Sequence, residues 1–224
     1  MRIPKTILIL LFIFLLSKTL ISQSVSVYAG YPYYFMQLEE HSYEVKQKTN
    51  YITGFSVNKY AGLSKLEVGF AYATKDYSYY HYYKNIKTEE THVHLNNYFI
   101  PLIFNNRIFT DSINTFSLSF GTVFIKPSGY YTDRIFRDST TINSENKFVL
   151  NKWDYSLRIG FKYSRLLSAK LILFSELYGN YKFNPDNRGS AIQYLYIEDD
   201  RFDMGINIGL ELLFNKKKLD YYRN

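Results

Sequence analysis

The stretch Trp153 to Tyr163 reads WDYSLRIGFKY, and its side chains alternate between large apolar residues and small or charged ones. Successive side chains of a β-strand point to opposite faces, so this alternation predicts a strand with one apolar and one polar face. The apolar face carries Trp153, Tyr155, Leu157, Ile159, Phe161 and Tyr163, and the other face carries Asp154, Ser156, Arg158, Gly160 and Lys162. Six large side chains on one face favour a closed barrel in lipid with a polar interior.

Seven further segments repeat this pattern. They predict strands near residues 24–35, 51–57, 66–74, 93–104, 116–124, 169–183 and 202–214. The last of these alternates as clearly as the stretch at Trp153, whereas the segment 93–104 alternates poorly. The sequence therefore predicts eight strands in all.

The predicted connections alternate in length. Long polar connections lie near residues 38–50, 75–91, 127–148 and 184–200, and the connections between them lie near residues 59–65, 105–112 and 165–168. Long extracellular loops and short periplasmic turns are typical of outer-membrane barrels. The fold class is therefore predicted to be all-β, as an eight-stranded antiparallel up-and-down transmembrane β-barrel that follows a cleaved signal peptide.

The chain begins with the layout of a signal peptide. Arg2 and Lys5 precede an apolar run over residues 6–16, and small and polar residues follow up to a cleavage site after Ser22. Lys18 ends the apolar run well short of the roughly 20 residues that a spanning helix needs. Residues 1–22 are expected to be the signal peptide, residues 23–214 the barrel, and residues 215–224 a basic C-terminal tail.

Composition narrows the class of protein further. The chain has no cysteine, so it is expected to be neither a lipoprotein nor a disulfide scaffold. Aromatic residues make up 19% of the 224 residues, which suits the aromatic girdles of a membrane barrel. The net charge of +7 includes three basic residues of the predicted signal peptide and is weak evidence for nucleic acid. We expect the bacterial outer membrane as the location.

Several of these segments also resemble a known family. The stretch YFIPLIF at residues 98–104, with FSLSFGTVFIKPSG from Phe116, is similar to a hairpin of the PorT-like outer-membrane β-barrel proteins. WDYSLRIGFKYSRLL and GINIGLELLF are similar to the last hairpins of that family. The resemblance covers most of the predicted mature chain and implies an eight-stranded membrane barrel without catalytic residues. The chain departs from the family pattern because it continues for ten residues past Phe214.

Energetics assign the polar faces to the barrel interior. A lysine or arginine that faces lipid at the bilayer centre costs about 2 to 4 kcal/mol, so Arg158 and Lys162 are expected to point inward. An eight-stranded barrel is narrow enough for side chains to fill it. We expect a structural polar network in the lumen, formed by Glu67, Asp154, Arg158, Lys162, Glu176, Asp203 and Glu211. A turn at residues 166–168 would pair Arg158 with Glu176 as a central salt bridge.

Histidines are the obvious candidates for chemistry. His92 and His94 share one face of a predicted strand, but two ligands make a weak metal site. His81 lies close in sequence to Ser78 and Asp76, and a hydrolase would need a serine as nucleophile and an acidic partner beside such a histidine. The segment 76–83 is instead expected to be the tyrosine-rich base of a loop at the membrane interface. We therefore expect no catalytic residue, no metal site and no cofactor.

The expected function is that of an outer-membrane barrel with a largely plugged, polar lumen, which acts as a structural or interaction protein through four long extracellular loops. The alternatives are a narrow pore for small solutes, a lipid-modifying barrel enzyme, and a secreted soluble barrel with an apolar ligand inside. The expected partners are outer-membrane lipid and a protein at the loops, with no nucleic acid and a monomeric barrel. Arg134 and Arg137 are candidates for contact with lipopolysaccharide phosphates, against the simpler interpretation of a solvated loop.

Overall fold

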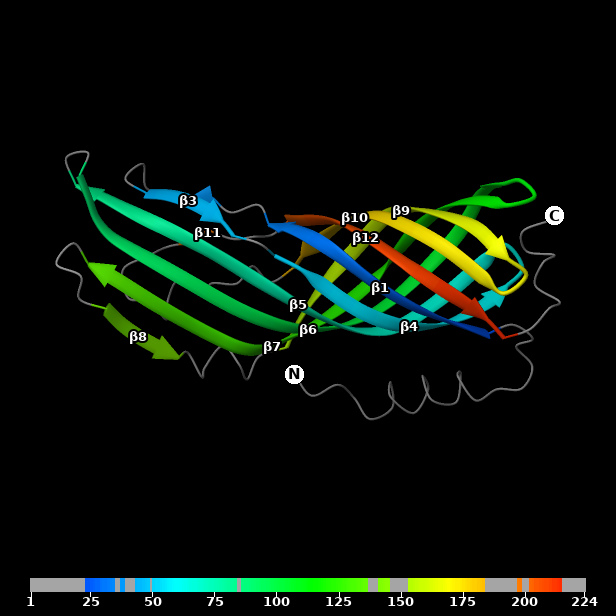
Figure 1. Cartoon of the computed structure of the whole chain (residues 1–224), viewed down its shortest axis with the longest axis horizontal. Helices are drawn as coiled ribbons and strands as arrows, with labels where there is room; N and C mark the ends of the chain where they lie inside the picture. Colours follow the sequence, from blue (N-terminus) through cyan, green and yellow to red (C-terminus); the bar gives the residue numbers. More distant parts are fainter. Residues whose placement is uncertain are drawn as a thin grey trace.

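The structure is a computed structural model, and its strands enclose an elongated barrel (Figure 1). It describes residues 23–34, 37–38, 43–48, 50–83, 86–136, 141–145, 153–183, 197–198 and 202–214. The predicted signal peptide, residues 1–22, and the predicted basic tail, residues 215–224, lie outside these ranges and stay predictions. No helix in the described part of the chain is long and apolar enough to cross a membrane.

Eight antiparallel strands form a closed ring, as the sequence predicts. In ring order they are β1 (Gln23–Tyr34), β4 (Ile52–Ala61), β5 (Ser64–Tyr83), β6 (Ile86–Thr110), β7 (Asn114–Phe136), β9 (Asp154–Ser168), β10 (Leu171–Lys182) and β12 (Phe202–Leu213). The ladder between β1 and β12 runs from Ser24 opposite Leu213 to Tyr34 opposite Asp203 and closes the ring. Each strand of the ring therefore pairs with a neighbour on both sides.

Four shorter strands lie outside the ring. They are β2 (Gln37–Leu38), β3 (Tyr43–Gln47), β8 (Thr141–Glu145) and β11 (Ile197–Glu198). β3 extends the sheet beside β5, β8 extends it beside β7, and β2 pairs with β11 in a separate ladder. All four belong to the long connections between ring strands. They therefore lie at the end of the barrel opposite to the short turns.

The strand faces divide into a buried and an exposed set as the alternation predicts. In β9 the apolar Leu157, Ile159 and Phe161 are exposed, whereas Arg158 and Lys162 are buried. Along β12 exposed and buried residues alternate without interruption. The exposed face of the ring is apolar on each strand and includes Val27, Phe55, Phe70, Phe104, Phe120, Ile159, Leu177 and Ile208. A band of this kind is stable only against hydrocarbon, so the barrel is built to stand in a lipid bilayer.

Strand length shows that part of the sheet extends beyond this band. β1, β10 and β12 have 12 residues each, close to the 9 to 11 that a tilted membrane strand needs, whereas β5, β6 and β7 have 20, 25 and 23. These three strands run far past the barrel at the end opposite to the short turns (Figure 1). With β3 and β8 at their edges they form a five-stranded sheet, here called the projecting sheet.

The projecting sheet corrects two predictions. The segments 75–91 and 127–148 were expected to be long polar loops, but β5 continues to Tyr83, β6 begins at Ile86, and β7 continues to Phe136. The sequence pattern misses these extensions because tyrosine, threonine, histidine and charged residues occupy both faces there, so no apolar alternation marks a strand outside lipid. Backbone pairing between neighbouring strands provides the order instead.

The strand β6 alternates regularly in the structure although its sequence does not. Thr91, Val93, Leu95, Asn97 and Phe99 are all buried, and the residues between them are at least partly exposed. The predicted strand at residues 93–104 is confirmed, and its sequence alternates poorly because the inward residues of this strand are themselves largely apolar. Apolar side chains on both faces remove the contrast on which the pattern depends.

Short turns join the strands at the other end of the barrel. The β4–β5 turn contains Gly62, whose φ of 59° lies in the left-handed region that glycine adopts without steric cost. The turn between β9 and β10 is formed by Ala169 and Lys170. This position lies later than the predicted turn at residues 166–168, and the register changes as a consequence.

A charge on the lipid-facing side of β9 should destabilise the barrel. In Ile159→Arg the guanidinium would replace an exposed apolar side chain in the middle of the strand, at a cost of about 2 to 4 kcal/mol. Urea unfolding in lipid vesicles measures this free energy. Leu167→Arg is the matched control, since Leu167 is also exposed but lies beside the short turn, where the cost falls to about 0 to 1 kcal/mol. Equal losses in the two variants would contradict the placement of the band.

Candidate functional site

Two buried ion pairs stand inside the barrel near the short turns. Lys65 Nζ lies 2.9 Å from Glu211 Oε2, and Lys162 Nζ lies 2.8 Å from Glu67 Oε2. We call these four residues the turn-end charge cluster. They come from β5, β9 and β12, so the closure of the ring brings them together. Lys162 is 2% exposed and Glu211 is fully buried, and charges that are buried so deeply are tolerated only when they are paired and hydrogen-bonded.

Neutral polar groups complete the hydrogen bonding of this cluster. The Tyr60 and Ser24 hydroxyls both donate to Glu211 Oε1, and Asn105 Nδ2 donates to Glu67 Oε2 at 3.5 Å. The Lys162 ammonium also lies 4.1 Å from the centroid of the Phe174 ring, a distance that suits a cation–π contact. The cluster is thus a packed polar layer in which each carboxylate accepts several hydrogen bonds.

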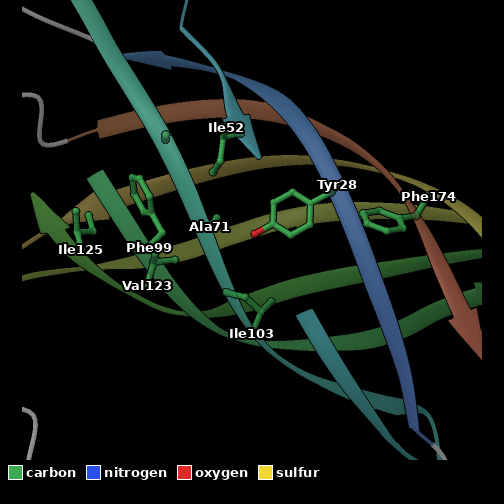
Figure 2. Close-up of a cluster of buried hydrophobic side chains, with 9 residues drawn as sticks. Tyr28, Ile52, Ala71, Phe99, Ile103, Val123, Ile125 and Phe174 are labelled. Atoms are coloured by element: carbon green, nitrogen blue, oxygen red, sulfur yellow. The ribbon is translucent and has the colours of Figure 1, made fainter. Parts of the chain in front are cut away.

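A buried apolar group fills the next part of the interior (Figure 2). Its members are Tyr28, Ile52, Ala71, Ala73, Phe99, Ile103, Val123, Ile125 and Phe174. Figure 2 shows these side chains pointing into the space that the strands enclose. The expectation of a polar lumen therefore needs correction: an apolar group lies between charged residues along β5, where it separates Glu67 from Lys75.

Glycines make room for aromatic rings inside the barrel. Tyr178 of β10 lies opposite Gly205 of β12 in the ladder, and both face inward. A Cβ atom at Gly205 would lie 2.5 Å from the Tyr178 hydroxyl oxygen, closer than any real contact. The missing side chain at Gly205 therefore lets the Tyr178 ring lie over the neighbouring strand.

Arg158 has a different partner from the predicted one. Its direct neighbour across the β9–β10 ladder is Asn180, and Arg158 Nε donates to Asn180 Oδ1 at 2.8 Å. Asn180 in turn donates to Asp203, and the Arg158 guanidinium stacks 3.9 Å from the centroid of the Tyr178 ring. The predicted register was wrong: Glu176 lies opposite Lys162, two inward positions away from Asn180. No ion pair joins Arg158 and Glu176 among the described residues.

The seven residues of the expected lumen network lie at different places in the barrel. Glu67, Lys162 and Glu211 belong to the turn-end charge cluster, and Arg158 and Asp203 are joined through Asn180. Glu176 is buried and accepts a hydrogen bond from Asn207 Nδ2 at 3.3 Å. Asp154 is half-buried and lines a void at the other end of the lumen. The structure therefore places the seven residues in several groups rather than in one network.

Sequence reasoning missed three buried lysines on the same inward face. On β5, Lys65 lies on the same face as Glu67, and Lys75 lies on the same face as Ala71 and Ala73. On β10, Lys182 lies on the same face as Glu176. Extending the alternation to the ends of the strands would have found them. Lys75 and Lys182 line the void near Asp154 and Asp203, so side chains of both charges surround it.

A small void lies inside the barrel. It is lined by Tyr34, Lys75, Asp154, Lys182 and Asp203, among others, and has a volume of about 10 Å³. A water molecule needs roughly 10 to 15 Å³, so this void holds about one. Around it, the described strands point charged and apolar side chains into the lumen.

A second polar cluster lies on the projecting sheet, on the face that continues the exposed face of the barrel. Ser78 of β5 and His92 of β6 are direct neighbours in the ladder, and Ser78 Oγ lies 2.6 Å from His92 Nδ1. Lys48 Nζ approaches the same nitrogen at 2.8 Å, and Glu90 Oε1 lies 3.1 Å from His92 Nε2. We call Lys48, Ser78, Glu90 and His92 the sheet cluster.

The hydrogen bonds decide the tautomer of His92. An ammonium group can only donate, so the contact with Lys48 makes Nδ1 the acceptor and leaves the proton on Nε2, which lies 3.1 Å from Glu90 Oε1. Burial and the Lys48 charge lower the pKa of His92 from its ordinary value of 6.5, although Glu90 acts in the opposite direction. His94 lowers this pKa further and Asp133 raises it. The imidazole is therefore neutral at pH 7.

Glu90 stays ionised in this arrangement. Burial raises the pKa of its carboxyl, but the Lys87 hydrogen bond, with the charges of Lys87 and Lys48, outweighs this effect and lowers the pKa. The Lys87 ammonium donates to Glu90 Oε2. The carboxylate can thus hold the His92 ring in one orientation.

The other histidines are placed differently from their expected neighbours. His81 Nδ1 lies 3.0 Å from Thr88 Oγ1, so His92, and not His81, is the histidine next to Ser78. His92 and His94 share a face, but His94 Nδ1 lies 3.2 Å from Asp76 Oδ1. In the described part of the chain no three histidine or carboxylate side chains converge as a metal site. The Arg134 side chain and Arg137 fall outside what the structure describes.

Breaking one buried ion pair should destabilise the barrel strongly. Lys162→Met leaves the Glu67 carboxylate buried without its nearest cation, and the expected loss is about 3 to 5 kcal/mol. Equilibrium unfolding in detergent or vesicles measures it. Lys170→Met in the exposed β9–β10 turn is the matched control and should change stability by less than about 0.5 kcal/mol. A loss at Lys162 as small as this would show that the pair is not buried in solution.

The Lys48 charge should be visible in the titration of His92. Removing it in Lys48→Met takes away one cause of the lowered pKa, so the pKa of His92 should rise. NMR titration of the imidazole resonances in micelles measures this shift, and Lys170→Met should leave the curve unchanged. A pKa of His92 that stays constant or falls in Lys48→Met would contradict the contact between the two side chains.

Comparison with known proteins supports the fold. No protein-family model matches the sequence, and no curated protein is similar to it. A major outer membrane protein from Thermus thermophilus is similar in structure, with a TM-score of 0.52 and 14% identity over 86% of this chain and 99% of that one. The N-terminal β-barrel domain of Pseudomonas aeruginosa OprF (TM-score 0.44, 12% identity, 85% and 97% covered) and Yersinia pestis Ail (0.41, 8%, 86% and 98%) also match. The chain has the fold of an eight-stranded outer-membrane β-barrel.

Proposed function

We propose that this chain is an integral outer-membrane β-barrel protein with a closed interior, and that its activity resides in the projecting sheet. The proposal includes export by residues 1–22, a barrel over residues 23–214 and a basic tail beyond it. It also retains the PorT-like family, for which the resemblance in sequence is the support. The single observation that carries the proposal is the contrast between a barrel with buried charged and apolar side chains inside and a sheet that extends far beyond the lipid-facing band.

The filled lumen supports a structural role for the barrel. Ion pairs, hydrogen bonds and apolar packing occupy the interior from the turn-end charge cluster to the void near Asp154. A solute path would require several of these contacts to separate together. Because each buried charge would lose its partner, opening is energetically costly, which disfavours the alternative of a narrow pore.

The projecting sheet has the features of a contact surface. It presents the exposed Lys46 and Lys48, and its Tyr80 ring lies between Lys46 Nζ at 5.1 Å and Lys87 Nζ at 4.4 Å from the centroid. Aromatic rings with flanking cations suit polar and anionic partners. Outer-membrane lipid, lipopolysaccharide phosphates and a protein partner are the proposed contacts of a monomeric barrel.

Planar bilayer recordings test the closed interior. The purified full-length protein should give no steady single-channel conductance, because no continuous aqueous path crosses the lumen. Steady, reproducible conductance steps would overturn the closed-interior proposal and favour the narrow pore.

The absence of conductance is informative only if the protein spans the membrane, so a labelling experiment accompanies the recordings. In intact cells a membrane-impermeant amine reagent should modify Lys87 on the projecting sheet and spare Lys170 in the short turn. Modification of Lys170 with protection of Lys87 would reverse the assigned orientation. Modification of both would show that the barrel does not span the membrane.

A further inference from the structure

The sheet cluster has the parts of a nucleophilic site. The Ser78 hydroxyl lies 2.6 Å from His92 Nδ1, and the opposite ring nitrogen faces the Glu90 carboxylate at 3.1 Å. A hydroxyl, an imidazole and a carboxylate connected in this order are recognised as a catalytic triad by geometry and role, whatever the fold and chain order. The three side chains come from neighbouring positions of two paired strands, which hold them rigidly.

The fourth member of the cluster adds a positive charge beside the nucleophile. Lys48 Nζ lies 2.8 Å from the same Nδ1 that Ser78 approaches. A cation in this position can stabilise the negative charge that develops on a carbonyl oxygen during attack. The tautomer of His92 fits as well, because Nδ1 carries a lone pair that can accept the serine proton.

We propose that Ser78, His92, Glu90 and Lys48 form a serine hydrolase site for carboxylic esters at the outer surface of the membrane. Ser78 is the nucleophile, His92 the general base and Lys48 the oxyanion stabiliser, and Glu90 is a positioning residue for the imidazole. The inference rests on the proposed function, since it requires the projecting sheet to stand outside the membrane.

The reaction balances without any further reagent besides water. Ser78 Oγ bonds to the ester carbonyl carbon while its proton passes to His92 Nδ1, and the carbonyl oxygen becomes an oxyanion beside Lys48. Collapse of this intermediate breaks the bond to the alcohol oxygen, which takes the proton from His92. Water then attacks the acyl-serine with His92 as base, and a carboxylic acid and free Ser78 result.

Lys48 is the exposed member of the cluster, beside the buried Ser78. Ser78 is only 1% exposed, whereas Lys48 is exposed and its ammonium ends on the nitrogen that Ser78 also contacts. A lysine side chain on the surface exchanges rotamers on a picosecond to nanosecond timescale. Movement of the ammonium from Nδ1 towards the substrate carbonyl would leave the Nδ1 lone pair to the serine proton and place the charge where the oxyanion forms.

The position of the cluster indicates the source of the ester. Ser78 follows Tyr72 on the same face of β5, and the Tyr72 ring lies 5.8 Å from that of Tyr98 on β6. Tyrosines at the edge of the lipid-facing band lie at headgroup level in membrane barrels. The cluster lies six residues beyond Tyr72 and hence on the aqueous side of the headgroups, and acyl esters of outer-leaflet lipids are the proposed substrates.

Two readouts on full-length protein in mixed micelles test the proposal. A fluorophosphonate probe should label Ser78, identified by mass spectrometry of its peptide, and a diacyl phospholipid should release fatty acid. Ser78→Ala and His92→Gln should lower the rate of release by at least about 100-fold, the typical contribution of a positioned base. Ser64→Ala and His81→Gln are the matched controls and should retain the rate, because neither residue belongs to the cluster.

Glu90→Gln separates positioning from a structural role. Loss of the carboxylate removes a charge that raises the pKa of His92, so the acid limb of the pH–rate profile should move to lower pH as the rate falls. A purely structural role would lower the amount of folded barrel without moving this limb.

Failure of the hydrolase site can be told apart from failure of the closed-barrel proposal. Wild-type protein that neither reacts with the probe nor hydrolyses lipid, or Ser78→Ala with the wild-type rate, would overturn the hydrolase site. Labelling without lipid hydrolysis would overturn the lipid substrate and keep the reactive serine. Because folding is checked separately by heat-dependent gel mobility, an inactive but folded barrel would leave the closed-barrel proposal intact.

Discussion

The requirement that each backbone polar group in lipid finds a partner within the chain governs this structure. An unpaired amide or carbonyl in hydrocarbon costs several kcal/mol, so a membrane sheet must close on itself. The ladder between β1 and β12 satisfies this requirement by joining the two ends of the barrel chain. Closure with eight strands then sets how narrow the interior becomes.

The narrow interior follows from closure with eight strands, and it determines what the interior can do. Charged residues that point inward have no bulk water around them and must find partners across the lumen, as Lys65 does with Glu211. Apolar side chains such as Phe99 and Val123 fill the space between the polar groups. The result is an interior in which buried charges and apolar side chains alternate along the barrel.

The same ladder that closes the barrel also builds the projecting sheet. β5, β6 and β7 keep their pairing beyond the lipid-facing band, so ordered backbone carries side chains well clear of the membrane. This is how Ser78 and His92, fourteen residues apart in sequence, become neighbours at hydrogen-bond distance. Sites built on paired strands are held more precisely than sites on loops, which is why the sheet cluster can have a defined geometry.

The sequence by itself determined the fold class, the strand faces and the inward direction of residues such as Arg158 and Lys162. These properties depend on local alternation and on the cost of placing a charge in lipid, and both can be judged from the residues of one strand at a time. Only the tertiary structure decided the partner of each inward charge, the apolar part of the lumen, the extent of β5 to β7 and the pairing of Ser78 with His92. Alternation fixes the face of a residue but not its register, because a shift by an even number of residues preserves every face. The turn at Ala169 and Lys170, with the register shift between Leu171 and Ile172, moved the partner of Arg158 by four residues, from Glu176 to Asn180.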